Sequence, residues 1–345
     1  MRTRMLTKSL TLIAVMLVLG AGMAAAQNVD YDQFEGSFED FAADLASSLP
    51  LNSSIGNNTP DAYIGKLLAV PPNFSVGVTT GASTIPYKTV EAAMDDLDLE
   101  KGEIDRFSGI GVPMPAYTVD ARVGGFVLPF DVGLKIGGVP RTDFGMMPAE
   151  LEYFLVGADV RYALIEQGAV LPNVSVGAGY NYLQGAVFIP DVDNNDYTFE
   201  IPDGSGDELA FSDPDLSFDW QSSVIDFKVQ ASKQFLVVTP FAGLGASYGI
   251  SAAGGGLESE LLYEGSKATE DDIDDIEQAF EDAGYDAPEL DRNDGIRIGS
   301  DVNGWGMRLF GGVGFNILAL KLDLGAGYDV LGNNFMGSLS ARFQL

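Results

Sequence analysis

The chain has 345 residues, of which 50 are acidic and 19 basic, and its net charge is −31 at neutral pH. This charge argues against nucleic-acid partners, because phosphate binding requires clustered Lys and Arg. The chain contains no Cys and no His, which excludes disulfides, a lipid-bearing Cys and nucleophiles activated by His. The usual His and Cys ligands of zinc and haem are missing too. The sequence therefore predicts no cofactor and no enzyme, although Ser–Lys and paired-carboxylate schemes stay open without a spacing that singles one out.

The first residues have the pattern of a secretory signal peptide. A basic start precedes an apolar run over 10–19, and small residues then lead to an A-x-A site at 24–26. The run is too short to span a membrane as a helix, which takes roughly 20 residues. We therefore expect cleavage before Gln27, so that the signal peptide comprises residues 1–26.

Alternation of apolar and polar residues dominates the rest of the chain. In the clearest segment, 318–329, Leu, Ala and Tyr alternate with Lys, Asp and Gly. Successive side chains point to opposite faces of a strand, so one face is oily and the other polar. Many of these segments have about the length of a tilted membrane crossing, ~9–11 residues. Ten such segments cover 73–82, 118–127, 130–138, 154–162, 174–182, 224–233, 238–248, 305–315, 318–329 and 335–345.

A soluble β-sandwich has the same period and is the alternative fold. However, the oily faces repeatedly end in aromatic residues, and the polar faces carry charges that a sandwich core rejects. The connections also alternate in length, as in transmembrane barrels. The long ones cover 84–117, 139–149, 190–215 and 254–301, and the short ones fall at 128–129, 165–172, 232–234 and 316–317. The link 331–334 is short, although its place in the order is that of a long connection. The sequence thus predicts an all-β fold, a closed antiparallel transmembrane β-barrel over residues 72–345, with about ten strands and roughly eight to fourteen allowed.

On these residues the chain resembles the bacterial outer-membrane β-barrels. Its last segment looks like their C-terminal targeting strand, with apolar residues alternating through Phe343 and Leu345. It departs from that strand by ending in Leu instead of Phe and by carrying Ser340 where Gly is common. The resemblance implies an outer-membrane location, with outer-membrane lipid and the outer-membrane assembly machinery as partners.

Residues 27–71 precede the first strand, and we expect them to form a periplasmic or plug segment. Apolar residues there share one face of an amphipathic helix. They are Phe34, Phe38, Phe41, Leu45 and Leu49. Asp30 and Gln33 are spaced like a capping box, and Pro50 is expected to end the helix. This segment is similar to the plug of the long-chain fatty-acid transporter family, but that family's Asn-Pro-Ala motif is missing and the chain is short for its larger barrel.

Charged residues on the polar faces form the main candidate site. They are Asp120, Arg122, Asp131, Lys135, Asp159, Arg161, Asp226, Lys228, Arg308, Lys321, Asp323, Asp329 and Arg342. One interpretation is a salt-bridged interior that fills a narrow barrel, because buried charges are tolerated when paired. The other is a small pore whose charged wall filters solutes.

The long connections carry two further features. Asp191, Asp193 and Asn195 resemble the start of a calcium loop, yet Asp196 and Pro202 stand where that loop needs Gly and a bidentate Glu. Weak binding of divalent cations and a merely solvated acidic loop both stay open. Helices are predicted over 89–97 and 269–284, with Thr269 and Gly284 capping the second.

Three functional hypotheses follow from these patterns. The leading one is a small channel or solute-uptake barrel with an acidic extracellular vestibule, because the interior face is polar and rich in Gly. The second is a closed structural or surface-interaction barrel that displays the acidic loops. The third is a plugged transporter of apolar ligands, suggested by the phenylalanines of the N-terminal helix.

Overall fold

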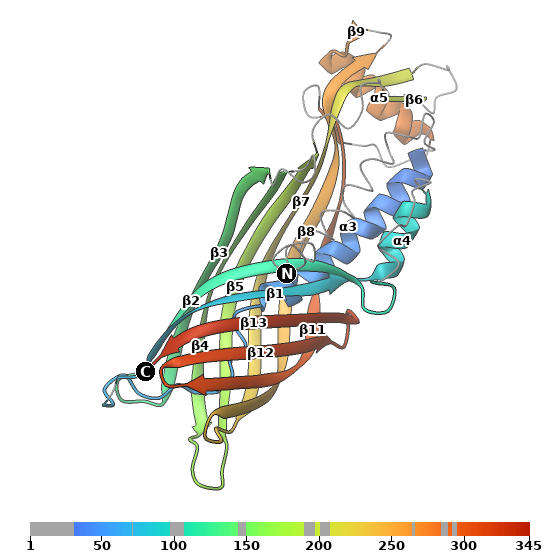
Figure 1. Ribbon diagram of the computed structural model, residues 1–345. Coiled ribbons are helices and arrows are strands. Elements are labelled where there is room, and N and C mark those ends of the chain that lie inside the picture. Colours follow the sequence, from blue (N-terminus) through green and yellow to red (C-terminus); the bar gives the residue numbers. More distant parts are fainter. Residues whose placement is uncertain are drawn as a thin grey trace, which may run out of the picture.

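The computed structural model describes residues 31–70, 72–96, 107–143, 150–189, 197–200, 208–263, 266–283, 289–291 and 295–345. Its main body is a closed antiparallel barrel of ten strands (Figure 1). The barrel strands are β1 (Phe74–Ile85), β2 (Val112–Gly124), β3 (Phe130–Asp143), β4 (Glu150–Ile165), β5 (Asn173–Ile189), β7 (Glu208–Ser232), β8 (Val238–Tyr263), β11 (Gly295–Ile317), β12 (Leu320–Asp329) and β13 (Asn334–Gln344). Each of the ten predicted segments falls on one of them, so the predicted fold and strand number are confirmed.

In the described residues, three short strands extend the sheet beyond the barrel, and three helices accompany it. The strands are β6 (Tyr197–Glu200), β9 (Ser266–Lys267) and β10 (Glu289–Asp291). The helices are α3 (Tyr31–Ser53), α4 (Tyr87–Asp96) and α5 (Glu270–Ala283). No helix in the described part of the chain is long and apolar enough to cross a membrane.

The barrel closes between its first and last strands, β1 and β13, with Ser75 opposite Gln344. The consecutive barrel strands β8 and β11 are paired from Val238↔Phe315 to Leu257↔Ile296. Tight turns join the strands at the end that holds the C-terminus, which is the periplasmic end in this class. Leu236 and Leu318 have positive φ in two of these turns. The turn between β11 and β12 therefore lies at 318–319. The sequence pattern placed this turn at 316–317, two residues too early in the chain, and that prediction was wrong.

The outer surface of the barrel is a belt of exposed apolar side chains. Leu309 and Leu324 are 50% and 57% exposed, whereas their polar neighbours in sequence point inward. Aromatic residues pair across strands on this surface near both rims. Tyr248 stacks edge-on against Trp305 with ring centroids 5.4 Å apart, and the Phe74 and Phe343 rings lie 6.2 Å apart at the other end. An apolar belt of this kind is stable only when hydrocarbon surrounds it.

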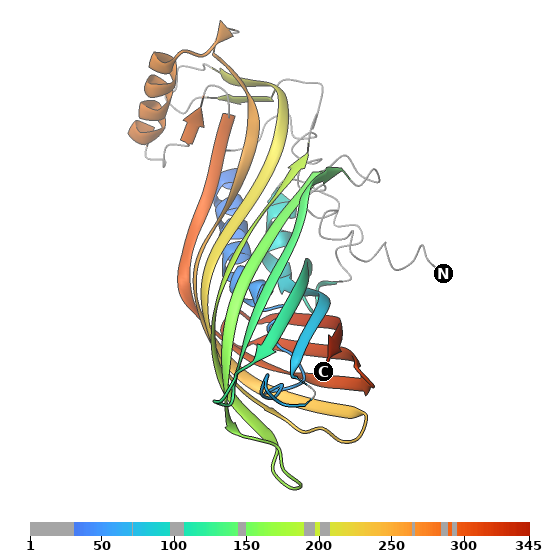
Figure 2. The same cartoon turned by 90° about the vertical axis from the view of Figure 1, so that its left-hand side faces the viewer.

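Three strands rise far above the others and build one tall wall. β7, β8 and β11 have 25, 26 and 23 residues, whereas β12 and β13 have 10 and 11. Figures 1 and 2 show this wall curving away from the barrel, with β6, β9 and α5 near its top. Large parts of the predicted loops 190–215 and 254–301 are therefore strand. The prediction missed this because the extensions do not show clear alternation of oily and polar residues.

Helix α3 runs along the inner side of this wall and contacts β7, β8, β11 and α4 (Figures 1 and 2). Phe41, Leu45 and Leu49 are at most 2% exposed, while the side chains of Phe34 and Phe38 lie outside the described residues. The helix does not end at Pro50, as predicted, but continues to Ser53. Proline removes only one helical hydrogen bond there.

Two contacts hold the last turn of α3 in place despite Pro50. Gly249 leaves room for the proline ring, since a Cβ at this position would lie 2.5 Å from Cγ of Pro50. The Asn52 amide donates to the Met114 carbonyl at 3.0 Å. Gly56 then turns the chain with φ +85°, a conformation that favours glycine. The close contact of Gly56 with Thr118 leaves no space for a side chain either.

Helix α5 begins with a reciprocal cap. The Asp272 amide donates to Thr269 Oγ1 at 3.2 Å, and the Thr269 amide donates to Asp272 Oδ2 at 2.8 Å. The predicted N-cap is therefore confirmed, with Asp at the position where Glu is usual. Gly284, the predicted C-terminal cap, lies outside the described residues.

This cap predicts a local dependence on pH. Hydrogen bonds from the Thr269 side chain and backbone lower the pKa of Asp272. The cap is therefore fully formed above the ordinary Asp pKa of about 3.9 and weakens as the pH falls through the lowered value. Hydrogen exchange of the first α5 amides should accelerate in this acid range. In Thr269→Ala, exchange of those amides should be faster already at pH 7, and an identical pH profile in both proteins would contradict the prediction.

Candidate functional site

The candidate site lies inside the barrel, where all thirteen charged residues predicted for the polar face are buried. Each is at most 9% exposed. The alternation places them inward, because their neighbours in sequence form the apolar outer belt. Most lie toward the periplasmic half of the strands. The structure therefore brings them together as one layer of charge, and what matters chemically is how each charge is compensated.

Asp131 on β3 is the centre of this layer. Its carboxylate accepts from Arg122 at 2.5 Å and from two nitrogens of Arg161 at 2.8 and 3.0 Å. Arg122 also donates to Asp159 at 2.5 Å. The chain of alternating charges thus links β2, β3 and β4 across the lumen side of the wall. Such an arrangement keeps the groups charged, because each finds an opposite charge within hydrogen-bond distance.

Two further pairs lie on the other side of the barrel. Arg308 binds both oxygens of Asp226, at 2.6 and 2.8 Å, and Arg342 binds Asp323 at 2.5 Å. Asp329 instead accepts from the Leu331 amide at 2.9 Å and so belongs to a turn at the rim. The Arg308–Asp226 and Arg342–Asp323 pairs each join two strands of the barrel wall, and neither pair includes a residue from outside the wall.

The remaining cations of the wall bind the segment that follows α3. Lys228 donates to the Asn57 carbonyl at 2.6 Å, and Lys135 donates to the carbonyls of Ser53 and Ile55, the latter at 2.8 Å. These carbonyls lie at and just beyond the end of α3, where the helix dipole is negative. Two lysines therefore face the end of the helix that attracts positive charge.

The same segment is held further down by Arg161, Gln230 and Lys321. Arg161 donates to the Asp61 carbonyl at 2.5 Å, and Gln230 donates to the Thr59 carbonyl at 2.6 Å. Lys321 pairs with the Asp61 carboxylate at 2.6 Å. Asp61 brings the buried charged residues of the described chain to seven carboxylates and seven cations. The lumen is thus electrically balanced, although the whole chain is strongly acidic.

Above the charged layer the interior is apolar, which the sequence analysis did not predict. The inward side chains there are buried and pack around α3. They are Ile85, Val112, Met114, Ala116, Tyr153, Leu155, Leu183, Val187, Phe218 and Trp220. Phe41 meets Phe218 edge-on with ring centroids 5.7 Å apart. Strands with apolar residues on both faces lose the alternation, so the sequence pattern predicts loops for much of this half of the barrel.

The sequence analysis also missed the residues that bind the wall from within. Asn52 lies in the last turn of α3, and Asn57, Thr59 and Asp61 lie in the stretch between α3 and β1. The available signal was its composition, since 52–61 is rich in Asn, Ser and Thr and directly follows an amphipathic helix. Such residues are as typical of a solvated linker, so the composition alone did not identify the contact.

The predicted cation ligands Asp191, Asp193 and Asn195 lie outside the described residues. Within the described residues no cluster of three or more acidic side chains is arranged to hold a metal ion.

A closed barrel with an apolar belt, aromatic pairs at its rims and a polar inner layer defines an outer-membrane β-barrel protein, and its location is the bacterial outer membrane. No family model and no curated protein matches the chain. Among solved structures it is similar to the outer membrane protease OmpT from Escherichia coli, with 9% identity, a TM-score of 0.39 and coverage of 80% of this chain and 97% of that one.

Two more barrels show the range of similar structures. The translocator domain of the autotransporter NalP from Neisseria meningitidis has 10% identity and a TM-score of 0.35, with 89% of this chain and 99% of that one covered. A Pseudomonas aeruginosa FadL homologue has 9% identity and a TM-score of 0.27, with 79% and 90% covered. At this distance the similarities carry no argument about function, so function has to be argued from the lumen itself.

Pairing inside the lumen predicts a large effect of removing one partner. Asp226→Asn leaves the buried Arg308 without a carboxylate and should lower the free energy of unfolding by about 3–5 kcal/mol. The matched control is Glu150→Gln, which breaks the exposed pair with Arg141 and should cost about 0–1 kcal/mol. Denaturant titration in lipid vesicles measures both losses. Equal losses in the two variants would show that burial of the pair does not matter.

Proposed function

We propose that this protein is an outer-membrane uptake barrel for small polar solutes, closed at rest by residues 41–64 and opened when they move. One observation carries the proposal. The wall pairs most of its charges internally, while Lys135, Lys228 and Gln230 bind main-chain carbonyls of the segment. Water can replace a carbonyl at a lysine, whereas it does not replace a buried carboxylate.

Displacement of the segment would therefore leave the wall stable and polar. The pairs Arg122–Asp131, Arg308–Asp226 and Arg342–Asp323 stay within the wall. Only Lys321 loses its carboxylate, since its partner Asp61 belongs to the segment. A lumen that held a stretch of polypeptide would then hold water and small solutes, with charges lining its wall as in selective channels.

A reversible crosslink tests the proposal, because the chain has no Cys of its own. Asn57 of the segment donates to Asn181 of β5 at 3.1 Å, so cysteines at both positions lie within reach of a short bis-methanethiosulfonate. Planar-bilayer recordings of Asn57→Cys/Asn181→Cys should show few openings when crosslinked and should recover openings after reduction. A deletion of residues 27–71 should conduct in both conditions.

The control crosslink joins two wall strands and leaves the segment free. Ser222 and Ser251 lie opposite each other on β7 and β8, with their hydroxyl oxygens 2.7 Å apart. Ser222→Cys/Ser251→Cys, treated with the same reagent, should open as often as the untreated protein. If neither the wild type nor the 27–71 deletion conducts, the barrel is not a channel.

The tall wall favours a second function, interaction at the cell surface. A strand of 26 residues is roughly 85 Å long, far more than a membrane crossing needs. The excess carries β9, α5 and β10 outward on a rigid support. This function predicts that replacing 264–294 by a short turn leaves the barrel folded but removes surface binding. Calcium binding, measured by titration, is the first readout. Unchanged calcium binding after the replacement would show that residues 264–294 do not hold the calcium site.

The third hypothesis, transport of apolar ligands through the interior, gains less from the structure. The upper interior is apolar, as that hypothesis requires. However, Phe41, Leu45 and Leu49 of α3 pack into it and are buried. The apolar surface inside the barrel is therefore covered by the apolar side chains of α3.

A further inference from the structure

The barrel wall is interrupted between β2 and β3. These two strands are paired over only six residues, from Val119↔Ile136 to Gly124↔Asp131. Beyond Val119, β2 continues beside β1 up to Val112, while β3 continues beside β4. The two strands therefore separate in the extracellular half of the wall.

Two glycines mark the point of separation. A side chain at Gly137 would collide with the Tyr117 carbonyl, so only glycine allows β3 to come this close to β2. Gly138 follows directly, and a Cβ there would meet only β4, with the Tyr153 carbonyl at 3.2 Å. The ladder between β3 and β4 then shifts register between Val139 and Thr142. A bulge of this kind bends a strand away from its neighbour.

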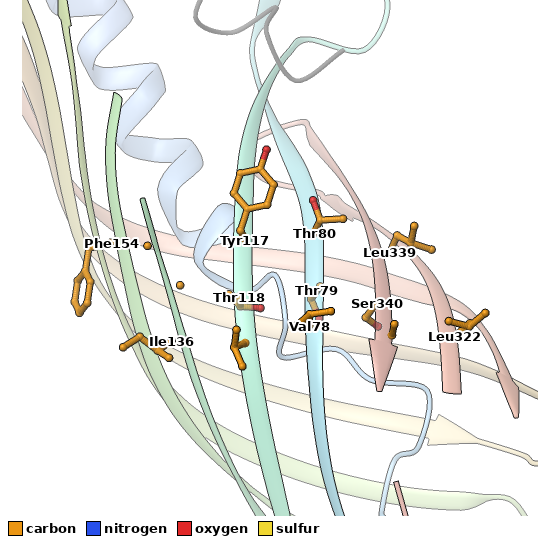
Figure 3. A pocket seen from close by; sticks show the side chains of 14 residues that line it. Val78, Thr79, Thr80, Tyr117, Thr118, Ile136, Phe154, Leu322, Leu339 and Ser340 are labelled. Carbon is orange, nitrogen blue, oxygen red and sulfur yellow. The ribbon is translucent and has the colours of Figure 1, made fainter. Parts of the chain in front are cut away.

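A pocket of about 780 Å³ lies on the wall at this seam. Ile136 and Phe154 lie on one side of it in Figure 3, and Val78, Leu339 and Leu322 on the other. Val78, Ile136 and Leu339 are 55%, 54% and 56% exposed, so the pocket opens on the outer surface. No charged side chain lines it. The hydroxyls of Thr and Ser residues and of Tyr117 are its polar side-chain groups.

We propose that this groove binds an acyl chain of the surrounding membrane lipid, which fills the wall where β2 and β3 separate. The groove lies within the apolar belt, where hydrocarbon and not water is the surrounding solvent. A hollow without charged side chains fits a hydrocarbon chain and offers no counter-charge for an ionised headgroup. The chain would cover apolar side chains that have no neighbouring strand. This inference is independent of the channel proposed above, because it concerns the outer face of the wall.

Photolabelling in nanodiscs tests the proposal. The probe is a phosphatidylcholine with a diazirine at mid-chain, and the adducts are mapped by peptide mass spectrometry. Adducts should concentrate on β2, β3 and β13 compared with the belt around Leu244 and Leu309. Gly138→Phe fills the groove and should lower labelling of the seam about fivefold, as expected when contacts of one or two methylene groups are lost.

The matched control is Gly311→Phe on β11. Gly311 has a comparable clearance, since its Cβ would lie 3.0 Å from the Phe241 carbonyl, and it is remote from the seam. This variant should leave labelling of the seam unchanged. Leu339→Trp fills the groove from β13 and replaces Gly138→Phe should that variant fail to fold. Uniform labelling around the belt, or labelling of the seam that persists in the folded groove-filling variants, would overturn the proposal.

Discussion

Compensation of buried charge is the constraint on which the rest of this structure depends. Fourteen charged side chains are buried in the described part of the chain, and the low polarity of such an interior makes any unpaired charge costly. Asp131 shows how the constraint is met, since it accepts from Arg122, from Arg161 and from the Ile64 amide. Because the Ile64 amide belongs to the N-terminal segment, the hydrogen bonds that Asp131 accepts also place that segment in the lumen.

The interior consists of an apolar layer and a charged layer, and one continuous segment of the chain packs into both. Its helical part buries Leu45 and Leu49 against apolar side chains of the wall, and its extended part offers carbonyls and Asp61 to wall cations. The helix ends where the layers meet, so that its negative end faces Lys135 and Lys228. The apolar layer holds by packing, while the polar layer holds by hydrogen bonds that water can replace. This difference is why water is proposed to take over the hydrogen bonds of the polar layer when the segment moves.

Much of the wall could be predicted from the sequence, and the failures have one cause. Strands such as β12 face hydrocarbon on one side and a polar lumen on the other, so Leu320 to Asp329 alternate strictly. Where the lumen is apolar, as at Met114 and Leu155, both faces carry similar residues and the signal disappears. The same holds for the helix end, since Pro50 ends a helix in isolation but not one whose last turn is held by Gly249 and the Met114 carbonyl.

By itself, the sequence determined that the chain forms ten crossing strands with an oily and a polar face, because that pattern is local and reflects the two media that a strand separates. It also determined which charges point inward. Only the tertiary structure decided which of them meet, since Lys321 pairs with Asp61 across 260 residues. The separation of β2 and β3 at Gly137 is also a feature that only the tertiary structure shows. Such contacts depend on which side chains become neighbours in space, and the order of residues along one strand does not specify those neighbours.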